Sequence, residues 1–277
     1  MQALTTTTTR VARQLRTAAL AAALACVSNG AYAAFASIII DGLGVTGTAA
    51  PGSFIFAPSD TRNNSWDLEV LTNNVLNQQN TGSVGNWVPL DRTAQTAQAK
   101  GTVSTSVDTD PSTQLETPRF TMSATANAPS ANGVLYTALG NMISEGSFCF
   151  WDSNTAFDGT SASCTGAGSL SLTLFYDLIV SSPFGAPNSA YAEIDVLGTG
   201  VPGGFFFDFA GTALGIPSKQ DRFFSWTADI TTGNAASFLL AGTVVAEAIP
   251  EPGVLSLAAL GLVGLALTRR RRGRAAS

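Results

Sequence analysis

Apolar and polar residues alternate with a period of two in several short stretches of the chain. The clearest examples are Trp66–Val70, Leu170–Leu178 and Ala190–Val196, where small and branched apolar residues alternate with Glu193 and Asp195. Because successive side chains of a strand point to opposite faces, this period indicates strands that are buried on one face. It places Glu193 and Asp195 together on an outward face.

Other short apolar stretches lie between turn residues and extend this pattern. The strands predicted from them are Phe35–Ile40, Ser53–Phe56, Gly101–Val107, Phe120–Ala126, Val134–Leu139, Ser147–Trp151, Phe205–Ala210, Phe223–Ile230 and Ser237–Ala246. Thr231–Asn234 has the composition of a hairpin loop joining the last two. No long stretch has a helical period, so we predict an all-β fold, a β-sandwich for which a jelly-roll-like arrangement is one option. The scarcity of lysine leaves few charges to protect edge strands, which we expect to be covered by loops or used for association.

The N-terminus has the three-part layout of a secretory signal peptide. Three arginines precede an apolar run at residues 17–27, and the small-residue pattern Ala-Tyr-Ala follows at residues 31–33. This layout predicts removal of residues 1–33, with cleavage between Ala33 and Ala34 by signal peptidase. An uncleaved membrane anchor is the alternative, but about 11 apolar residues fall short of the roughly 20 that a spanning helix needs.

The C-terminus, residues 250–277, combines a short motif, an apolar run and a cationic cluster. The motif is Pro250, Glu251 and Pro252, the uncharged run covers residues 254–267, and the cluster is Arg269, Arg270, Arg271 and Arg272. As a helix the run would be about 21 Å long. Adding Gly253 and Thr268, with snorkelling arginine side chains, nearly closes the gap to a hydrocarbon core of about 30 Å. The arginines would hold the extreme C-terminus in the cytoplasm.

This ending resembles the PEP-CTERM sorting signal of Gram-negative bacteria in its three parts and in their order. The resemblance covers only about the last 28 residues. It implies recognition by an exosortase, a membrane cysteine transpeptidase that removes the tail near the Pro-Glu-Pro motif. It also implies a transient stay in the inner membrane and transfer of the body to the cell surface or exopolysaccharide matrix, because members are associated with biofilm and floc formation. It implies nothing about residues 34–249, and a plain single-span anchor is the alternative.

Charge is scarce and unevenly distributed. Charged residues make up 12% of the chain, about half of the roughly 25% that is usual. Eight of the 14 Lys and Arg lie in the end segments, whereas all 19 Asp and Glu lie between Asp41 and Glu251. Six basic against nineteen acidic residues therefore give the intervening chain a net charge of −13. Such a body would repel nucleic acid and could attract cations such as Ca²⁺.

The chain contains no histidine. This excludes Ser-His-Asp and Cys-His nucleophile systems, His-based zinc sites and the usual general base near neutral pH. Glu193 and Asp195 are candidate carboxylates for a glycosidase, but such pairs usually come from different strands. A solvated strand face is the favoured interpretation, and we expect the body not to be an enzyme.

Cys149 and Cys164 are the two cysteines left after removal of the predicted signal peptide, which contains Cys26. An even number in an exported chain indicates one disulfide, with two free thiols as the alternative. Within their loop, Asp152, Asn154 and Asp158 offer hard oxygen ligands that could bind Ca²⁺. The same residue types are ordinary turn formers.

Two tryptophans are candidates for stacking on sugars, because an aromatic ring offers a flat apolar face. Trp87 precedes a Val-Pro turn and Trp151 lies beside the cysteine loop, so both are expected at the surface. Trp66 and Trp226 lie on alternating strands and are expected in the core.

The leading functional hypothesis is a non-catalytic surface or extracellular-matrix protein, exported and then sorted by an exosortase. The alternative is a carbohydrate-binding module for exopolysaccharide, and a carboxylate-based glycan hydrolase ranks third. A glycan array would separate the first two hypotheses, and release of reducing sugars would support the third.

Overall fold

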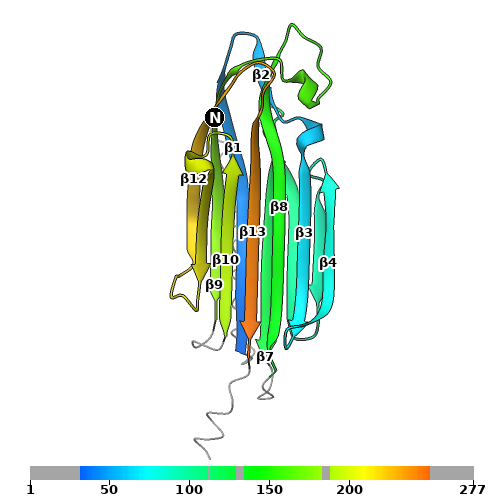
Figure 1. Cartoon of the computed structure of the whole chain (residues 1–277), viewed down its shortest axis with the longest axis vertical. Helices are drawn as coiled ribbons and strands as arrows, with labels where there is room; N and C mark the ends of the chain where they lie inside the picture. The colour runs from blue at the N-terminus through cyan, green and yellow to red at the C-terminus, as the bar shows by residue number, and fades with distance from the viewer. Residues whose placement is uncertain (1–31, 112, 129–133, 183–187, 250–277) are drawn as a thin grey trace, which may run out of the picture.

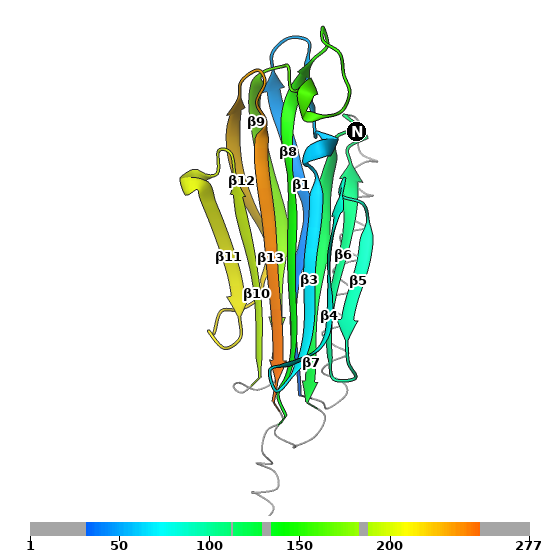
Figure 2. The same cartoon turned by 45° about the vertical axis from the view of Figure 1, so that its right-hand side comes forward.

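The computed structural model describes residues 32–249, except residue 112, residues 129–133 and residues 183–187. In these residues, thirteen strands form two antiparallel sheets that pack face to face, with the strands running along the long axis of the molecule (Figure 1, Figure 2). The strands are β1 (Tyr32–Ala49), β2 (Ser53–Phe56), β3 (Asn63–Thr72), β4 (Val75–Gly85), β5 (Leu90–Gln95), β6 (Ala99–Thr109), β7 (Glu116–Ala128), β8 (Tyr136–Asp152), β9 (Gly168–Ser181), β10 (Ser189–Gly198), β11 (Phe205–Gly211), β12 (Lys219–Ile230) and β13 (Ala236–Ala248). The predicted β-sandwich is confirmed.

The two sheets are assembled from strands that are mostly distant in sequence. The first sheet has the order β12-β9-β1-β7-β6-β5, and the second has the order β11-β10-β13-β8-β3-β4, with β2 paired to β8. We describe the fold as a two-layer sandwich, and a jelly-roll-like arrangement stays a prediction.

The core follows the alternation seen in the sequence. The even-numbered residues of Leu170–Leu178 on β9 are at most 2% exposed, and Ala192, Ile194 and Val196 on β10 are fully buried. Their inward faces meet across the space between the sheets, which explains why every second position must be apolar. The predicted segment Ser147–Trp151 and all but the first two residues of the predicted segment Val134–Leu139 belong to one long strand, β8.

The hairpin predicted at Thr231–Asn234 is wrong. β12 pairs with β9 in the first sheet, whereas β13 pairs with β8 and β10 in the second. The loop therefore crosses between layers, and the backbone N–H of Gly233 donates to the carbonyl oxygen of Cys164 at 2.8 Å. Alternation shows only that each strand has one buried face, and two such strands can pair side by side or face each other across the core.

The two long sides of the sandwich are closed in different ways. On the β4–β5 side, Asn80 accepts a hydrogen bond from the indole N–H of Trp66 at 3.0 Å and donates to the carbonyl oxygen of Thr93 at 3.1 Å. On the β11–β12 side, Phe206 stacks on Phe224 with ring centroids 3.9 Å apart. One side is thus closed by amide side chains and the other by aromatic rings.

A half-buried polar cluster reinforces the aromatic side. The hydroxyl of Tyr176 donates to Asp208 at 2.7 Å, and Lys219 forms an ion pair with the same carboxylate. Burial raises the pKa of Tyr176, and the hydrogen bond to Asp208 raises it further. Burial alone would raise the pKa of Asp208, but hydrogen bonds from Lys219 and Tyr176 outweigh it and the pKa is lowered. Asp208 is therefore ionised at neutral pH and ties β11 to β12 and β9.

Candidate functional site

An aromatic hollow lies at the upper end of the sandwich in Figure 1, where β2 meets the loop that follows β8. β2 pairs with the end of β8, so that Phe54 lies opposite Trp151 and Phe56 opposite Cys149. The hollow has a volume of about 430 Å³. Its lining is formed by Phe54, Ile55, Phe56, Ala57, Ser59, Arg62, Thr113, Gln114, Leu115, Glu116, Trp151, Phe157 and Gly159.

Four aromatic rings follow one another around this hollow. Ring centroids are 6.0 Å apart between Phe54 and Trp151, 5.0 Å between Trp151 and Phe157, and 5.1 Å between Phe157 and Phe56. Phe54 and Phe157 are more than half exposed, and Trp151 is half-buried. The indole N–H of Trp151 donates to the carbonyl oxygen of Thr155 at 3.2 Å, which holds its ring in place. The rings offer apolar surface to a ligand at the end of the molecule.

An ion pair forms the polar part of the lining. Arg62 pairs with Glu116, and its Nε donates to the carbonyl oxygen of Ala57 at 3.2 Å. The guanidinium also lies 5.2 Å from the ring centroid of Trp87 beneath it. Arg62 is thus fixed and its charge is balanced by Glu116, so this part of the hollow offers polar atoms without a net charge.

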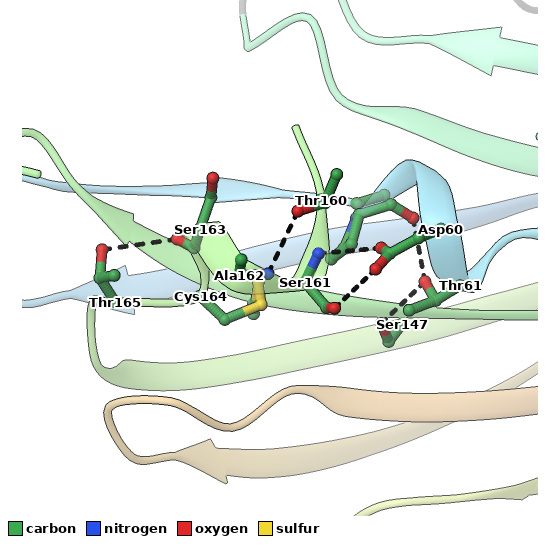
Figure 3. The surroundings of a disulfide bond; sticks show 12 residues. Asp60, Thr61, Ser147, Thr160, Ser161, Ala162, Ser163, Cys164 and Thr165 are labelled. Carbon is green, nitrogen blue, oxygen red and sulfur yellow. Dashed lines mark hydrogen bonds between the residues drawn. A yellow bond between two sulfur atoms is a disulfide. The ribbon is translucent and has the colours of Figure 1, made fainter. Parts of the chain in front are cut away.

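The predicted disulfide between Cys149 and Cys164 is present and closes the loop that carries Phe157, with Cα atoms 5.5 Å apart. The carboxylate of Asp60 holds this loop from outside it (Figure 3). Asp60, in the 3-10 turn η1 (Ser59–Thr61), accepts hydrogen bonds from the N–H and hydroxyl of Ser161 at 2.8 and 2.6 Å. The hydrogen bond from the Ser161 hydroxyl lowers the pKa of Asp60.

The three residues proposed as calcium ligands take part in two separate sets of hydrogen bonds within the loop. Oδ1 of Asp152 accepts from both nitrogens of Asn154 at 2.9 Å, whereas Oδ1 of Asp158 accepts from Ser163 at 2.7 Å and from Thr160 at 2.8 Å. The hydrogen bond from Ser163 is the main cause of the lowered pKa of Asp158. Within the described residues, no three His, Cys, Asp or Glu side chains gather in a way that could hold a metal. Calcium binding stays a prediction.

The expectation that Trp87 lies at the surface is wrong. Its side chain is 0% exposed, and its indole N–H donates to the carbonyl oxygen of Glu145 at 2.8 Å. The ring lies 5.9 Å from Phe238 and 6.3 Å from Phe148. The two residues that follow Trp87 are exposed. Trp87 itself has a positive φ of 48°, and its side chain is buried in the core. Trp87 therefore belongs to the core and cannot stack on a sugar.

The other candidates identified from the sequence have varied placements. Trp66 and Trp226 are buried, as predicted. Glu193 and Asp195 lie on the outward face of β10 and are half-buried. Burial raises the pKa of both carboxyls, and the charge of Asp195 raises that of Glu193 further.

The predicted processing sites lie mostly outside the described residues, which exclude Pro250, Glu251, Pro252 and Arg269, Arg270, Arg271 and Arg272. Ala33 and Ala34 lie in β1, which begins at Tyr32, and cleavage between them stays a prediction. The described residues contain no helix with the length and hydrophobicity needed to cross a bilayer.

Sequence reasoning identified Trp151 but missed Phe54, Phe56 and Phe157. The period-two spacing of Phe54 and Phe56 in a predicted strand was the available signal.

Comparison of the chain with protein-family models, curated proteins and solved structures finds no match.

Proposed function

We propose that the chain is an exported, non-catalytic surface or extracellular-matrix protein whose C-terminal segment is a sorting signal for an exosortase. In this proposal a signal peptide directs export, the apolar C-terminal helix spans the inner membrane transiently, and the β-sandwich is delivered to the cell surface or exopolysaccharide matrix. The observation that carries the proposal is the order of segments: cationic and apolar sequence at each end, with an acidic body between them. A disulfide within that body supports an oxidising destination.

Localisation of the chain in cells with and without an exosortase tests this proposal. An epitope inserted in the exposed turn at Gly233 would report the body. With exosortase present, mass spectrometry should find the body in the surface or matrix fraction without residues 1–33 and without the arginine cluster. Replacing Glu251 with Ala should leave an unprocessed, membrane-bound form, whereas Glu247→Ala, four residues earlier, should be processed normally. A full-length, reduced chain in the cytoplasm would refute the proposal.

The second candidate function is binding of a neutral carbohydrate in the aromatic hollow. The specific observation in its favour is the run of four rings, of which Phe54 and Phe157 are more than half exposed. The volume of about 430 Å³ lies within the roughly 300–1,000 Å³ typical of ligand pockets. A neutral ligand is favoured because Arg62 is already paired with Glu116 and the acidic body repels anions.

Titration with neutral oligosaccharides selected on a glycan array tests the carbohydrate hypothesis. Trp151→Ala should weaken binding by about tenfold, because it removes a central ring of the lining. Phe223→Ala is a matched control, since this phenylalanine is 67% exposed but lies on β12 away from the hollow. Equal effects of the two substitutions, or no bound glycan, would exclude the hollow as a carbohydrate site.

A further inference from the structure

The polar part of the aromatic hollow is built around one exposed carboxylate. Glu116 is the first residue of β7 and lines the hollow, where its Oε2 pairs with Arg62. The two partners differ in exposure, because the Glu116 side chain is 41% exposed and the Arg62 side chain is 15% exposed. A carboxylate has about four sites at which it can accept a hydrogen bond. Glu116 can therefore accept hydrogen bonds from a ligand while it stays paired with Arg62.

The donors of Arg62 are directed toward the protein. Its Nε and Nη2 donate to the carbonyl oxygen of Ala57, and its Nη1 pairs with Glu116. The guanidinium also lies 5.2 Å from the ring centroid of Trp87. Because these contacts fix the guanidinium, removal of the charge on Glu116 would leave an uncompensated positive charge at the hollow.

Other polar side chains of the lining add acceptors. The hydroxyl of Ser59 donates to the carbonyl oxygen of Gly159 at 3.1 Å, and the side-chain amide of Gln114 donates to the carbonyl oxygen of Pro111 at 3.1 Å. Both side chains keep oxygen lone pairs that can accept. The polar part of the hollow therefore favours a ligand that brings hydrogen-bond donors, as the hydroxyl groups of a sugar do. It disfavours a ligand that brings a negative charge near Glu116.

The turn before Glu116 is held in a strained conformation. Gln114 has a positive φ of 57°, which residues other than glycine adopt at a cost in free energy. Its backbone N–H donates to the carbonyl oxygen of Asp110 at 2.7 Å, and the N–H of Asp110 donates to the carbonyl oxygen of Leu115 at 2.9 Å. Backbone strain of this kind is concentrated at ligand sites. The turn thus presents Glu116 to the hollow from a fixed backbone.

We propose that Glu116 is the specificity-determining residue of the hollow and that it selects neutral hexose sugars over the corresponding uronic acids. The proposal rests on the carbohydrate function given above and identifies the class of sugar. The apolar C–H face of a hexopyranose packs on the ring of Trp151 or Phe157, and a hydroxyl of the same sugar donates to Glu116. A uronic acid would bring its carboxylate toward that of Glu116, and like charges in one site repel.

Isothermal titration calorimetry with matched pairs of oligosaccharides tests the proposal on the full-length chain in mild detergent. The probes are neutral hexamers of glucose, mannose and galactose, each paired with the hexamer of the same linkages in which every primary hydroxyl is oxidised to a carboxylate. The wild-type chain should bind a neutral hexamer roughly tenfold or more tightly than its acidic counterpart. Glu116→Gln keeps the shape of the side chain and removes its charge, so that Arg62 can attract the acidic hexamer. The ratio of neutral to acidic affinity should therefore fall by roughly tenfold.

Asp108→Asn is the matched control. Asp108 on β6 pairs with Arg119 on β7, and its side chain is 46% exposed, close to the 41% of Glu116. Arg119 lies three residues after Glu116 in β7 and therefore points to the opposite face of the sheet. The control removes the same charge from the protein but not from the hollow, so the affinity ratio should keep its wild-type value. Glu116→Asp retains the charge and should also retain the preference for the neutral hexamer.

The possible results separate this proposal from the carbohydrate function on which it rests. If no neutral hexamer binds the wild-type chain, the carbohydrate function fails and the proposal fails with it. If neutral hexamers bind and Trp151→Ala weakens them, the carbohydrate function stands. The proposal alone is then overturned by equal wild-type affinity for the two members of a pair, or by a ratio that Glu116→Gln shifts no more than Asp108→Asn does. Melting curves by circular dichroism identify any variant that has lost its fold, and the wild-type comparison needs no variant.

Discussion

Removal of the disulfide at the aromatic hollow should destabilise the protein by an amount set mainly by the length of its loop. Cys149 and Cys164 are 15 residues apart in sequence and both are buried. In the chain-entropy model, closing a loop of this length stabilises the fold by about 3 kcal/mol. Replacing both cysteines with alanine is the suitable perturbation, because a buried serine hydroxyl would add a desolvation cost of its own.

The remaining contacts of the loop determine whether its structure survives. Asp60 still holds Ser161, and Asp158 still holds Ser163, after the sulfurs are removed. These contacts lie at the exposed end of the sandwich, so the sheets should remain folded while the loop carrying Phe157 loosens. For a domain of this size, 1 kcal/mol corresponds to roughly 2–4 °C, so the melting temperature should fall by about 6–12 °C.

Thermal unfolding followed by circular dichroism, with and without reductant, measures this effect. The wild-type chain under reducing conditions should match the double-alanine variant, and reductant should not change the variant further. If the variant melts at the wild-type temperature, the loop-entropy reasoning is refuted. If it melts far lower and without cooperativity, the disulfide holds the sheets together as well as the loop.

Three further predictions concern other parts of the sandwich and can be measured by chemical denaturation. Burial raises the pKa of Glu193 above its ordinary value of 4.5 in the folded state. The protonated carboxyl therefore contributes to the free energy of unfolding in full below about pH 4.5, and this contribution is lost as the pH rises through the folded pKa. Glu193→Gln should therefore flatten the fall in unfolding free energy toward neutral pH, and an unchanged pH profile would contradict this. At Gly200, φ is +82° and an added Cβ would lie 1.9 Å from the carbonyl oxygen of Thr227, whereas Gly203 has φ +72° with open space around it. Gly203→Ala should cost about 1 kcal/mol from backbone strain, and Gly200→Ala should cost about 1–3 kcal/mol more from the clash; equal costs would show that the clash is relieved without penalty. Trp87→Ala should cost about 3–5 kcal/mol, because it empties a fully buried site, and a loss below 1 kcal/mol would indicate that the core is not packed around this ring.

The fold was predictable wherever one face of a strand is buried and the other is not. The alternation of β9 and β10 identified both strands and their inward residues. β4 was missed because it is an edge strand whose residues are exposed or half-exposed on both faces, and its polar sequence therefore carries no period. Strand pairing was harder to predict, as the hairpin expected at Thr231–Asn234 shows, because a period reports burial and not the identity of the neighbour.

The candidate site was only partly predictable for a related reason. Trp151 was identified because it lies beside a cysteine loop, but its companions come from β2 and from the middle of that loop. Trp87 has a sequence context typical of a surface turn, yet its ring is buried beneath Arg62. The direction of one side chain at a turn depends on local dihedral angles and on packing with distant residues, which short-range sequence patterns do not contain.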